Sequence, residues 1–527
     1  MSAKKSKSSN PLALGLALVI SGGVFVGGAL RLAPHLLPAG SLTGALGGAQ
    51  CSDPDAQVQL TALGDTFSGY STLRNPAFQG SLSEVNLGLC YQDEFDQEAR
   101  AAAIAEGQAD LIVTTLDQYL THQPPGKIVA LIDRTIGADA VVLNTRQFQQ
   151  LTSLLELEKL VAERAAQGQK LKIIFAGDTP SEFLALVLDT KFDNFNLADF
   201  EVIRVADASI AWEQMQTDPD IALGVLWEPF VNAARQQGNT VVLSSQDAPK
   251  VIVDVLIASD RALTENPQAV ASFVSTYYRR IDSSLQDQEL LTRQIAADGN
   301  LLLEDAIAIR EGISFFTSVE AQNWMNSGEL AQRIEAIAAI LALANRLPSV
   351  PQNIAELYTA QYIEPVAQNT AQLLETIAQN DPDLAKRLQA AKAPPQATPV
   401  SAAQAQNAPN IGNLTVRGEV NFATGSAQLT PQSNATLQQL AQEIQEFNPG
   451  TVGIKVQGHT SQTGAADVNQ RLSQQRAQVV VDFLKQQQQL QHSVFAEGLG
   501  YSQPLPGIAP NAPQNQRTVI RLIRLTP

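Results

Sequence analysis

The residues from Gly458 to Ala477, GHTSQTGAADVNQRLSQQRA, have the types and spacing needed to bind a carboxylate. An apolar run from Val452 to Gln457 predicts a strand that ends just before them. In the helical pattern that follows, Asn469, Leu472 and Arg476 lie three or four residues apart and so share one face. A guanidinium on that face, beside a polar loop, can hold a carboxylate by two parallel hydrogen bonds.

Supporting motifs lie on both sides of this stretch. Asn421 to Ala427 precedes a helical pattern, Gly498 to Tyr501 follows one, and Asn515 to Arg517 precedes the last predicted strand. In this order the motifs resemble the OmpA C-terminal domain family, and the resemblance runs from about Thr415 to Leu525. It implies an α+β domain that binds peptidoglycan, and we assign it residues 411–527.

The resemblance also implies which residues contact the wall peptide: Thr460, Ser461, Asn469, Leu472, Arg476 and Arg517. In the family, an Asp after the His-Thr pair and the Arg of LSxxRA grip the amine and the carboxylate of diaminopimelate. Here the arginine is Arg476, but Ser461 stands at the Asp position. A neutral hydroxyl cannot replace an ion pair with an ammonium. We therefore expect weakened wall binding, a substitute role for Asp467, a different wall peptide, or no binding.

A second set of candidate binding residues follows apolar runs between residues 55 and 347. These residues offer aromatic rings, hydroxyls and carboxylates: Phe67, Ser68, Tyr70, Thr114, Thr115, Asp117, Asp133, Thr179, Ser181, Trp227 and Glu228. Acids outnumber bases among them. A ligand that bears an amine, or a zwitterion, therefore fits at least as well as a small anion.

The elements that position these residues alternate between strand and helix patterns. The predicted strands are Val58–Leu63, Val85–Cys90, Leu111–Thr114, Ile128–Ile132, Ala140–Leu143, Leu171–Ala176, Val202–Val205 and Ile221–Leu226. Amphipathic segments such as Gln97–Glu106 lie between most of them. This alternation predicts an α/β fold with parallel-rich sheets, and its length suits two lobes. Ligands in such sheets bind beyond the carboxyl ends of the strands.

Four loop motifs carry a second resemblance: the aromatic loop Gly64–Tyr70, the acidic turn Asp133–Asp139, the helix start Gly177–Glu182, and Trp227–Pro229. Together they resemble periplasmic substrate-binding proteins of the nitrate, sulfonate, taurine and thiamine-precursor class. The resemblance covers about residues 55–347. It implies a two-lobed periplasmic-binding-protein fold that closes over a small-molecule solute and delivers it to an ABC permease.

Each candidate also has a purely structural interpretation. Thr179 to Glu182 is a capping box with Pro180 at the first helical position, which stabilises a helix start without any ligand. Free amides there could hold an anion, although Glu182 and Asp178 would repel it. Phe67 and Tyr70 could simply pack the lobe. Asp133 could pair with its neighbour Arg134.

The amino-terminal residues predict a membrane anchor. Residues 1–10 form a basic tail with Lys4, Lys5 and Lys7, and residues 11–31 are long and apolar enough to cross a bilayer. The positive-inside rule places the tail in the cytoplasm and the bulk of the chain in the periplasm. We therefore expect localisation to the inner membrane through a single uncleaved span.

The cysteine count and the net charge indicate how the chain is cross-linked and which partners it can bind. Cys51 and Cys90 are the only cysteines, and in an exported chain they predict one disulfide, with two buried thiols as the alternative. The formal net charge of −17 argues against nucleic acid as a partner. Residues 348–392 predict a helical spacer, and residues 393–410 a linker rich in Pro, Ala and Gln.

We expect no enzyme, no cofactor and no metal site. The four histidines are scattered, and no zinc, GxSxG or GxxxxGK motif occurs. The combined prediction is a membrane-anchored periplasmic solute-binding protein that serves an ABC-type transporter and is tethered to the wall. The alternative is a wall-linked tether or sensor whose lobes bind a protein partner.

Overall fold

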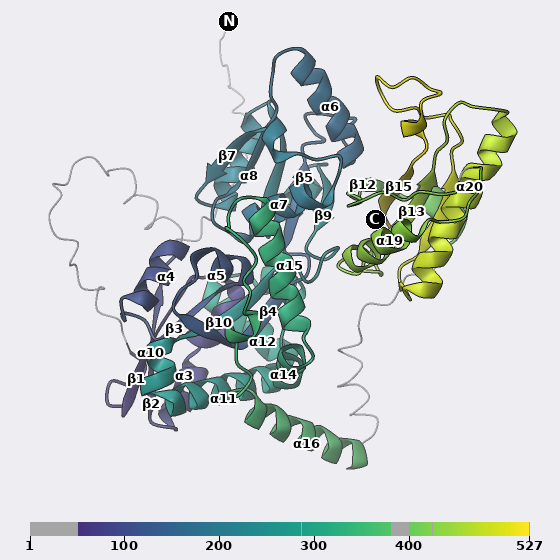
Figure 1. Cartoon of the computed structure of the whole chain (residues 1–527). Coiled ribbons are helices and arrows are strands. Elements are labelled where there is room, and N and C mark those ends of the chain that lie inside the picture. Colours follow the sequence, from purple (N-terminus) through teal and green to yellow (C-terminus); the bar gives the residue numbers. More distant parts are fainter. Residues whose placement is uncertain (1–50, 286, 381–399, 424, 526–527) are drawn as a thin grey trace, which may run out of the picture. The chain divides into compact units, whose positions relative to one another are not determined.

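The computed structural model describes residues 51–525 except 286, 381–399 and 424. Lobe I contains a six-stranded sheet with, in spatial order, β11 (Ile313–Phe315), β4 (Gly126–Thr135), β10 (Val253–Ser259), β3 (Leu111–Thr115), β1 (Val58–Gly64) and β2 (Leu87–Asp93). Strands from early and later parts of the chain lie in this one sheet, because the chain leaves lobe I and returns to it (Figure 1).

Helices cover this sheet. They are α2 (Ser71–Arg74), α3 (Pro76–Ser83), α4 (Gln97–Ala105), α5 (Leu116–His122), α10 (Asp260–Glu265), α11 (Pro267–Ser284), α12 (Gln288–Gly299), α13 (Leu303–Glu311) and α14 (Ser318–Asn326). A further helix, α16 (Glu364–Asn380), packs on α11 and α14. Tyr278 on α11 is fully buried, and its hydroxyl bonds both the N–H and the carbonyl of Leu131 at 3.0 and 2.8 Å. This pair of bonds fixes α11 against β4.

Lobe II contains a five-stranded sheet with the spatial order β7 (Glu201–Val205), β6 (Lys172–Ala176), β8 (Ile221–Trp227), β5 (Asp139–Leu143) and β9 (Thr240–Ser244). Its helices are α6 (Leu154–Ala166), α7 (Pro180–Lys191), α8 (Ala208–Thr217) and α9 (Phe230–Gln236). A further helix, α15 (Glu329–Leu343), contacts both α5 of lobe I and α7 of lobe II.

The chain crosses between the lobes twice, from β4 to β5 and from β9 to β10. In lobe I, β10 runs antiparallel to both β3 and β4; in lobe II, β5 runs antiparallel to both β8 and β9. The prediction of parallel-rich sheets is therefore wrong, and both sheets are mixed. The reason is that the outgoing and returning strands of a double crossover enter each sheet in opposite senses. The predicted strands are present with shifted ends, whereas β9, β10 and β11 were missed.

The predicted disulfide is confirmed, since Cys51 and Cys90 are bonded and tie the segment before β1 to strand β2. The basic tail (1–10) and the predicted anchor (11–31) lie outside the described residues. Within residues 51–525, and leaving out the gaps given above, no helix has the length and apolarity needed to span a membrane.

The C-terminal domain has a four-stranded sheet, with the order β12 (Asn410–Asn413), β15 (Thr518–Arg524), β13 (Val452–Gly458) and β14 (Val494–Gly498), and the helices α19 (Pro431–Ile444) and α20 (Ala466–Asp482). The predicted 393–410 linker is partly wrong, because α18 (Ala402–Asn407) and the start of β12 fall within it. Ser401 and Gln404 form a reciprocal capping box that starts α18.

Hydrogen bonds, an ion pair and a β-bridge join this domain to lobe II. Leu414 forms an antiparallel β-bridge with Phe192, which follows α7. Arg524 donates two hydrogen bonds, of 2.9 and 3.2 Å, to the fully buried carboxylate of Asp247 in the second crossover. The same carboxylate accepts hydrogen bonds from the N–H and the hydroxyl of Ser244. Its charge is thus fully compensated.

Candidate functional site

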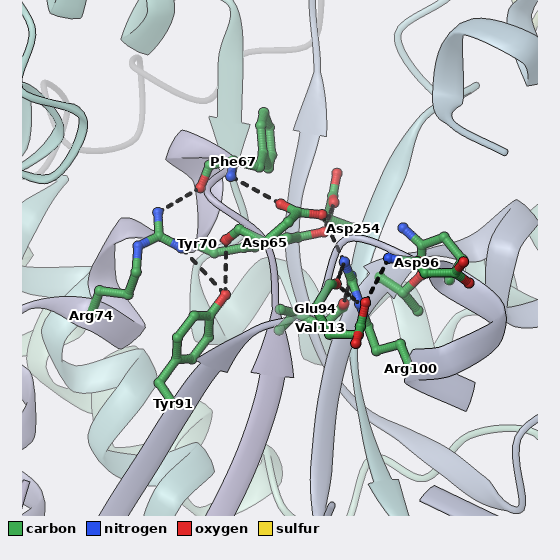
Figure 2. Close-up of polar contacts among 12 residues, drawn as sticks. Asp65, Phe67, Tyr70, Arg74, Tyr91, Glu94, Asp96, Arg100, Val113 and Asp254 are labelled. Carbon is green, nitrogen blue, oxygen red and sulfur yellow. Dashed lines mark hydrogen bonds and ion pairs between the residues drawn. The ribbon is translucent and has the colours of Figure 1, made fainter. Parts of the chain in front are cut away.

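The loop after β1 is fixed by side chains that bond its backbone. Figure 2 shows Arg74 and Tyr91 both reaching the carbonyl oxygen of Asp65, at 2.5 and 3.0 Å. Arg74 also donates to the carbonyl of Phe67 at 3.0 Å and pairs with Asp298 at 2.5 Å. The first residues of this loop are therefore held rigidly, which presets the positions of the aromatic rings behind them.

A second arginine, which is buried inside the lobe, also holds this loop in place. Arg100 on α4 is fully buried and pairs with the Asp65 carboxylate at 2.9 Å. It also donates to the carbonyl of Val113 at 2.6 Å, which joins the loop to β3 (Figure 2). Neither Arg74 nor Arg100 is free to bind a ligand, because acids and carbonyls of the lobe already occupy both.

Of the predicted aromatic pair, only Phe67 is partly exposed. Phe67 and Tyr70 meet edge to face with ring centroids 5.2 Å apart, and Tyr70 is buried. Ser68, also partly exposed, begins the short turn that carries Tyr70. The Tyr70 hydroxyl donates to Asp254 on β10 and points into the lobe. Phe67 and Ser68 thus remain candidates for contact with a ligand, whereas Tyr70 has a structural partner.

Asp133 lies within β4, not in a loop after it, and does not pair with Arg134. It is fully buried and sits opposite Asp254 in the β4–β10 register. Burial raises the pKa of both carboxyls, and the Asp133 charge raises the pKa of Asp254 further. Both carboxyls therefore favour their protonated forms. Arg134 points elsewhere: it pairs with Glu320 at 2.7 Å and lies over the Phe316 ring at 4.8 Å.

The end of β3 and the start of α5 carry the next predicted residues. Thr114 is occupied, because its hydroxyl donates to Gln97 on α4 at 2.8 Å. Thr115 is the N-cap residue of α5, but its buried hydroxyl makes no hydrogen bond within the described residues. Burial raises the pKa of Asp117. Gln118 donates to Asp117 Oδ2 at 2.9 Å, whereas Asp117 Oδ1 accepts no hydrogen bond within the described residues.

Lobe II brings two further carboxyls to this region. Asp139 on β5 pairs in register with Trp227 on β8, and the Glu228 N–H donates to the Ala138 carbonyl at 2.8 Å. Burial raises the pKa of Asp139 to about 7, and the nearby charges of Glu228 and Asp117 add to the effect. Burial also raises the pKa of Glu228. Trp227 is partly exposed at the end of β8.

The charges of Asp117 and Glu228, which were predicted as site residues, raise the pKa of Asp139, which was not. We call Asp117, Asp139 and Glu228 the interlobe acids. Asp139 could have been found from its turn, since Gly137-Ala138-Asp139 lies where the chain crosses between the lobes. Asp254 gave no local signal, because it interrupts an apolar run without a turn or a motif beside it.

The start of α7 serves its own helix. The Thr179 hydroxyl accepts the N–H of Ser181 at 3.3 Å, as expected of an N-cap. Glu182 accepts the N–H of Asp178 at 2.9 Å and pairs with Arg204 at 2.5 Å and with Arg346. A carboxylate of the chain itself thus occupies the place where an external anion would bind. The Ser181 hydroxyl is fully buried and makes no hydrogen bond within the described residues.

A groove of about 480 Å³ lies elsewhere on lobe II, between α6 and residues 193–200. Val161 and the stacked pair Phe195 and Phe200 supply much of its apolar lining. None of the predicted site residues lines it. It is therefore distinct from the strand-end site.

In the C-terminal domain, Arg476 on α20 is largely buried yet has no carboxylate partner within the described residues. Its Nε donates to the Ser426 carbonyl at 3.0 Å, and its guanidinium lies 5.0 Å from the Phe422 ring centroid. Burial lowers its pKa, and no acid opposes that effect. A guanidinium held in this way is prepared to accept a carboxylate.

The other predicted wall-binding residues surround Arg476 or support its loop. Ser461 accepts a hydrogen bond from Gln516 at 3.3 Å, and Gln516 in turn accepts one from Arg476 at 3.4 Å. Asn469 donates to the Thr463 carbonyl at 2.9 Å and so shapes the loop before α20. The buried Thr460 hydroxyl makes no hydrogen bond within residues 51–525 as described.

Two predicted residues lie at the margin of this site, and one suggested substitute acid lies outside it. Leu472 is partly exposed on α20. Arg517 donates to the Gln503 carbonyl at 3.1 Å. Asp467 is 67% exposed and pairs with Arg471 at 2.9 Å.

Comparison with known proteins agrees with this geometry. The OmpA family model matches residues 421–518. The C-terminal region is an OmpA family domain. It is 35% identical over 95 residues to outer membrane protein A of Shimwellia blattae, and 31% identical over 121 residues to that of Shigella flexneri. These alignments cover 18% and 23% of this chain but only 39% and 34% of the relatives, so the OmpA domain shares less than half of their length.

The lobes are similar to solved binding proteins at low sequence identity. The periplasmic aliphatic sulphonate binding protein of Escherichia coli is 12% identical, with a TM-score of 0.45 over 59% of this chain and 94% of the other. The periplasmic nitrate-binding protein of Synechocystis PCC 6803 is also 12% identical, with a TM-score of 0.46 over 62% and 92%. Because these scores are below 0.5, the two-lobed assignment rests on the double crossover and strand orders described above.

Proposed function

We propose that this protein is a solute-binding protein of the cell envelope, attached to peptidoglycan by its OmpA domain. The observation that carries the proposal is the presence in one chain of two complementary parts. A two-lobed α/β domain carries the buried acids Asp117 and Asp139, one in each lobe, and an OmpA family domain presents a guanidinium with no acid partner among the described residues. The first part suits a small solute and the second suits a wall carboxylate.

The finer parts of the proposal follow from the sequence. Residues 11–31 anchor the chain in the inner membrane, and the lobes deliver their solute to an ABC permease. Residues 348–410, which include α16 and α18, connect the lobes to the wall-binding domain in sequence. We assign the protein no catalytic role.

Retention of the full chain on isolated sacculi tests the wall half. Arg476→Ala should reduce retention by about 10- to 100-fold, because a charge-assisted hydrogen-bond pair is lost. Arg471→Ala is the matched control, since Arg471 lies on the same helix but is 67% exposed. Arg476→Lys keeps the charge and should lose less than the alanine variant. Equal retention of all four proteins would overturn wall binding through this site.

Native mass spectrometry of the full chain, extracted from the envelope of the producing cells, tests the solute half. A bound small molecule that dissociates when the lobes unfold supports the proposal. A chain that carries no small molecule, and that still binds sacculi through Arg476, would leave the wall-linked tether or sensor as the better function.

A further inference from the structure

Arg476 begins a short chain of hydrogen-bonded side chains in the OmpA domain. Its Nη1 donates to Gln516 Oε1 at 3.4 Å, and Gln516 Nε2 donates to Ser461 Oγ at 3.3 Å. The Ser461 hydroxyl lies 3.0 Å from the hydroxyl of Thr463. We call Gln516, Ser461 and Thr463 the uncharged relay. The guanidinium is the only charged group among these four side chains.

The uncharged relay meets solvent at one end. Gln516 is exposed, whereas Arg476 and Ser461 are buried, with 6% and 2% of their surface exposed. Arg476 Nη2 makes no hydrogen bond within the described residues, so it can donate to an incoming carboxylate. A ligand that meets Gln516 from solvent therefore reaches two further residues that are already hydrogen-bonded to it.

No acid of the described residues forms an ion pair with Arg476. Asp467 is the only acid between Gly458 and Ala477, and it pairs with Arg471 at 2.9 Å. Both side chains of that pair are 67% exposed. An ammonium beside a carboxylate bound to Arg476 would thus meet a guanidinium and no free acid, which is unfavourable.

The residues around the relay add positive charge to this site. Burial, together with the charges of Arg517 and Arg521, lowers the pKa of His459 to about 4, so its ring is neutral at pH 7. Arg517 directly follows Gln516, and it donates to the carbonyls of Asn515 and Gln503, not to an acid. A second positive charge on the ligand has no favourable place here.

A neutral amide suits the relay better than an ammonium does. Ser461 Oγ accepts from Gln516, which leaves its own proton for Thr463 or for a ligand. The neighbouring Thr460 hydroxyl is 3% exposed and makes no hydrogen bond within the described part of the chain. Hydroxyls both donate and accept, and so does an amide group, so the two can pair without any counterion.

We propose that the OmpA domain of this protein binds a wall peptide at a carboxylate whose neighbouring amine is acylated. Arg476 binds the carboxylate, and Ser461 and Gln516 hydrogen-bond to the amide. This inference rests on the proposed function and narrows its wall ligand. Two forms of peptidoglycan carry such an amide: a stem peptide that is cross-linked through its amine, and one whose amine bears a small acyl group.

Retention of the full chain on sacculi, before and after acetic anhydride treatment, tests the inference, because the reagent converts free amines into amides. The wild type should be retained on acetylated sacculi at least as well as on untreated ones. Ser461→Asp should reverse this order and lose about 10-fold on acetylation, because its added carboxylate then has no ammonium partner. A clear loss of wild-type retention on acetylation, or the same ratio for both proteins, would overturn the inference.

Gln516→Glu tests the relay itself. The new carboxylate would stand where the Gln516 oxygen now lies, 3.4 Å from Arg476 Nη1. It should pair with the guanidinium and lower retention on both kinds of sacculi by about 10-fold. The matched control is Gln514→Glu, which adds the same charge on an exposed side chain of the same short turn and should change neither retention. Equal losses in the two variants would make net charge the cause and overturn the role of the relay.

Soluble wall fragments distinguish the two sources of the amide. The competitors are a monomeric muropeptide with a free amine, the same monomer after acetylation, and a cross-linked dimer. Release by the acetylated monomer as well as by the dimer supports recognition of the amide alone, and release by the dimer only supports recognition of the cross-link. Strongest release by the free-amine monomer would overturn the inference. Retention on neither kind of sacculi, or retention that Arg476→Ala leaves unchanged, would overturn the proposed wall binding itself.

Discussion

The two candidate sites carry opposite imbalances of charge. Among the interlobe acids, Arg235 at 4.0 Å from Glu228 is the only base paired with any of them within the described residues. In the OmpA domain, Arg476 is buried without a paired acid in the same described part. Because a buried charge without a counterion costs free energy, the acids favour their protonated forms, whereas the guanidinium of Arg476 stays charged.

The two sites also tolerate their imbalance differently. A carboxyl can take up a proton, and Asp139, whose pKa is raised to about 7, does so close to neutral pH. A guanidinium cannot lose its proton in this range. Arg476 instead lies over the Phe422 ring and donates to the Ser426 carbonyl. The acid site is therefore sensitive to pH before any ligand binds, whereas the arginine site is not.

The largest expected effect concerns Asp139. The folded chain holds its proton more tightly than the unfolded chain, because its pKa rises from 3.8 to about 7. The unliganded lobes should therefore lose stability as pH rises from about 4 to about 7, by ~4 kcal/mol at most. Asp139→Asn should flatten this part of the profile, and calorimetry of the full chain between pH 4 and 8 measures it. If Asp139→Asn kept the slope of the wild type, other groups would be responsible.

A second variant adds a cation beside Asp117. Gln118→Lys places an ammonium where the Gln118 amide now lies, 2.9 Å from Asp117 Oδ2. It should stabilise the lobes at pH 8 by about 1–3 kcal/mol, because a charged pair replaces a neutral donor. The Tm of the variant measures this effect. A less stable variant would mean that Asp117 does not accept a counterion.

In the wall-binding site, the matching test adds an acid. Ser461→Asp places an acid next to Gln516, which links Ser461 to Arg476. If the wall peptide offers an ammonium beside its carboxylate, retention on sacculi should rise about 10-fold, or ~1.4 kcal/mol. A fall in retention would mean that Ser461 suits a wall peptide without that free amine.

The smallest effect is expected at Asp467. Its pair with Arg471 is 67% exposed on both sides. Asp467→Asn should change stability by less than ~0.5 kcal/mol and leave sacculus retention unaltered. A marked loss of retention would show that this exposed acid contacts the wall peptide after all.

The sequence predicted elements better than it predicted partners. The strand patterns of both lobes and the Cys51–Cys90 disulfide were found, because apolar runs and an even cysteine pair are local or countable signals. The mixed sheets were missed because β9 and β10 were not recognised. Without β10, the pairing of Asp254 with Asp133 and Tyr70 could not be anticipated.

The candidate site residues of the lobes show the same limit of prediction from sequence: their positions were found, but their partners were not. Asp117 and Glu228 follow strand ends and were assigned from that position alone. Whether a side chain there is free depends on distant residues: Gln97 engages Thr114, and Arg346 engages Glu182. Neither partner is near its target in sequence. A predicted site residue is therefore available to a ligand only if no residue distant in sequence already bonds it, and the sequence does not reveal such partners.

The raised pKa of Asp139 means that the lobes take up a proton when they fold between about pH 4 and pH 7. The heat of unfolding in this range would then depend on the ionisation enthalpy of the buffer, because unfolding releases that proton. The contribution of Asp139 to stability is therefore largest in an acidic medium.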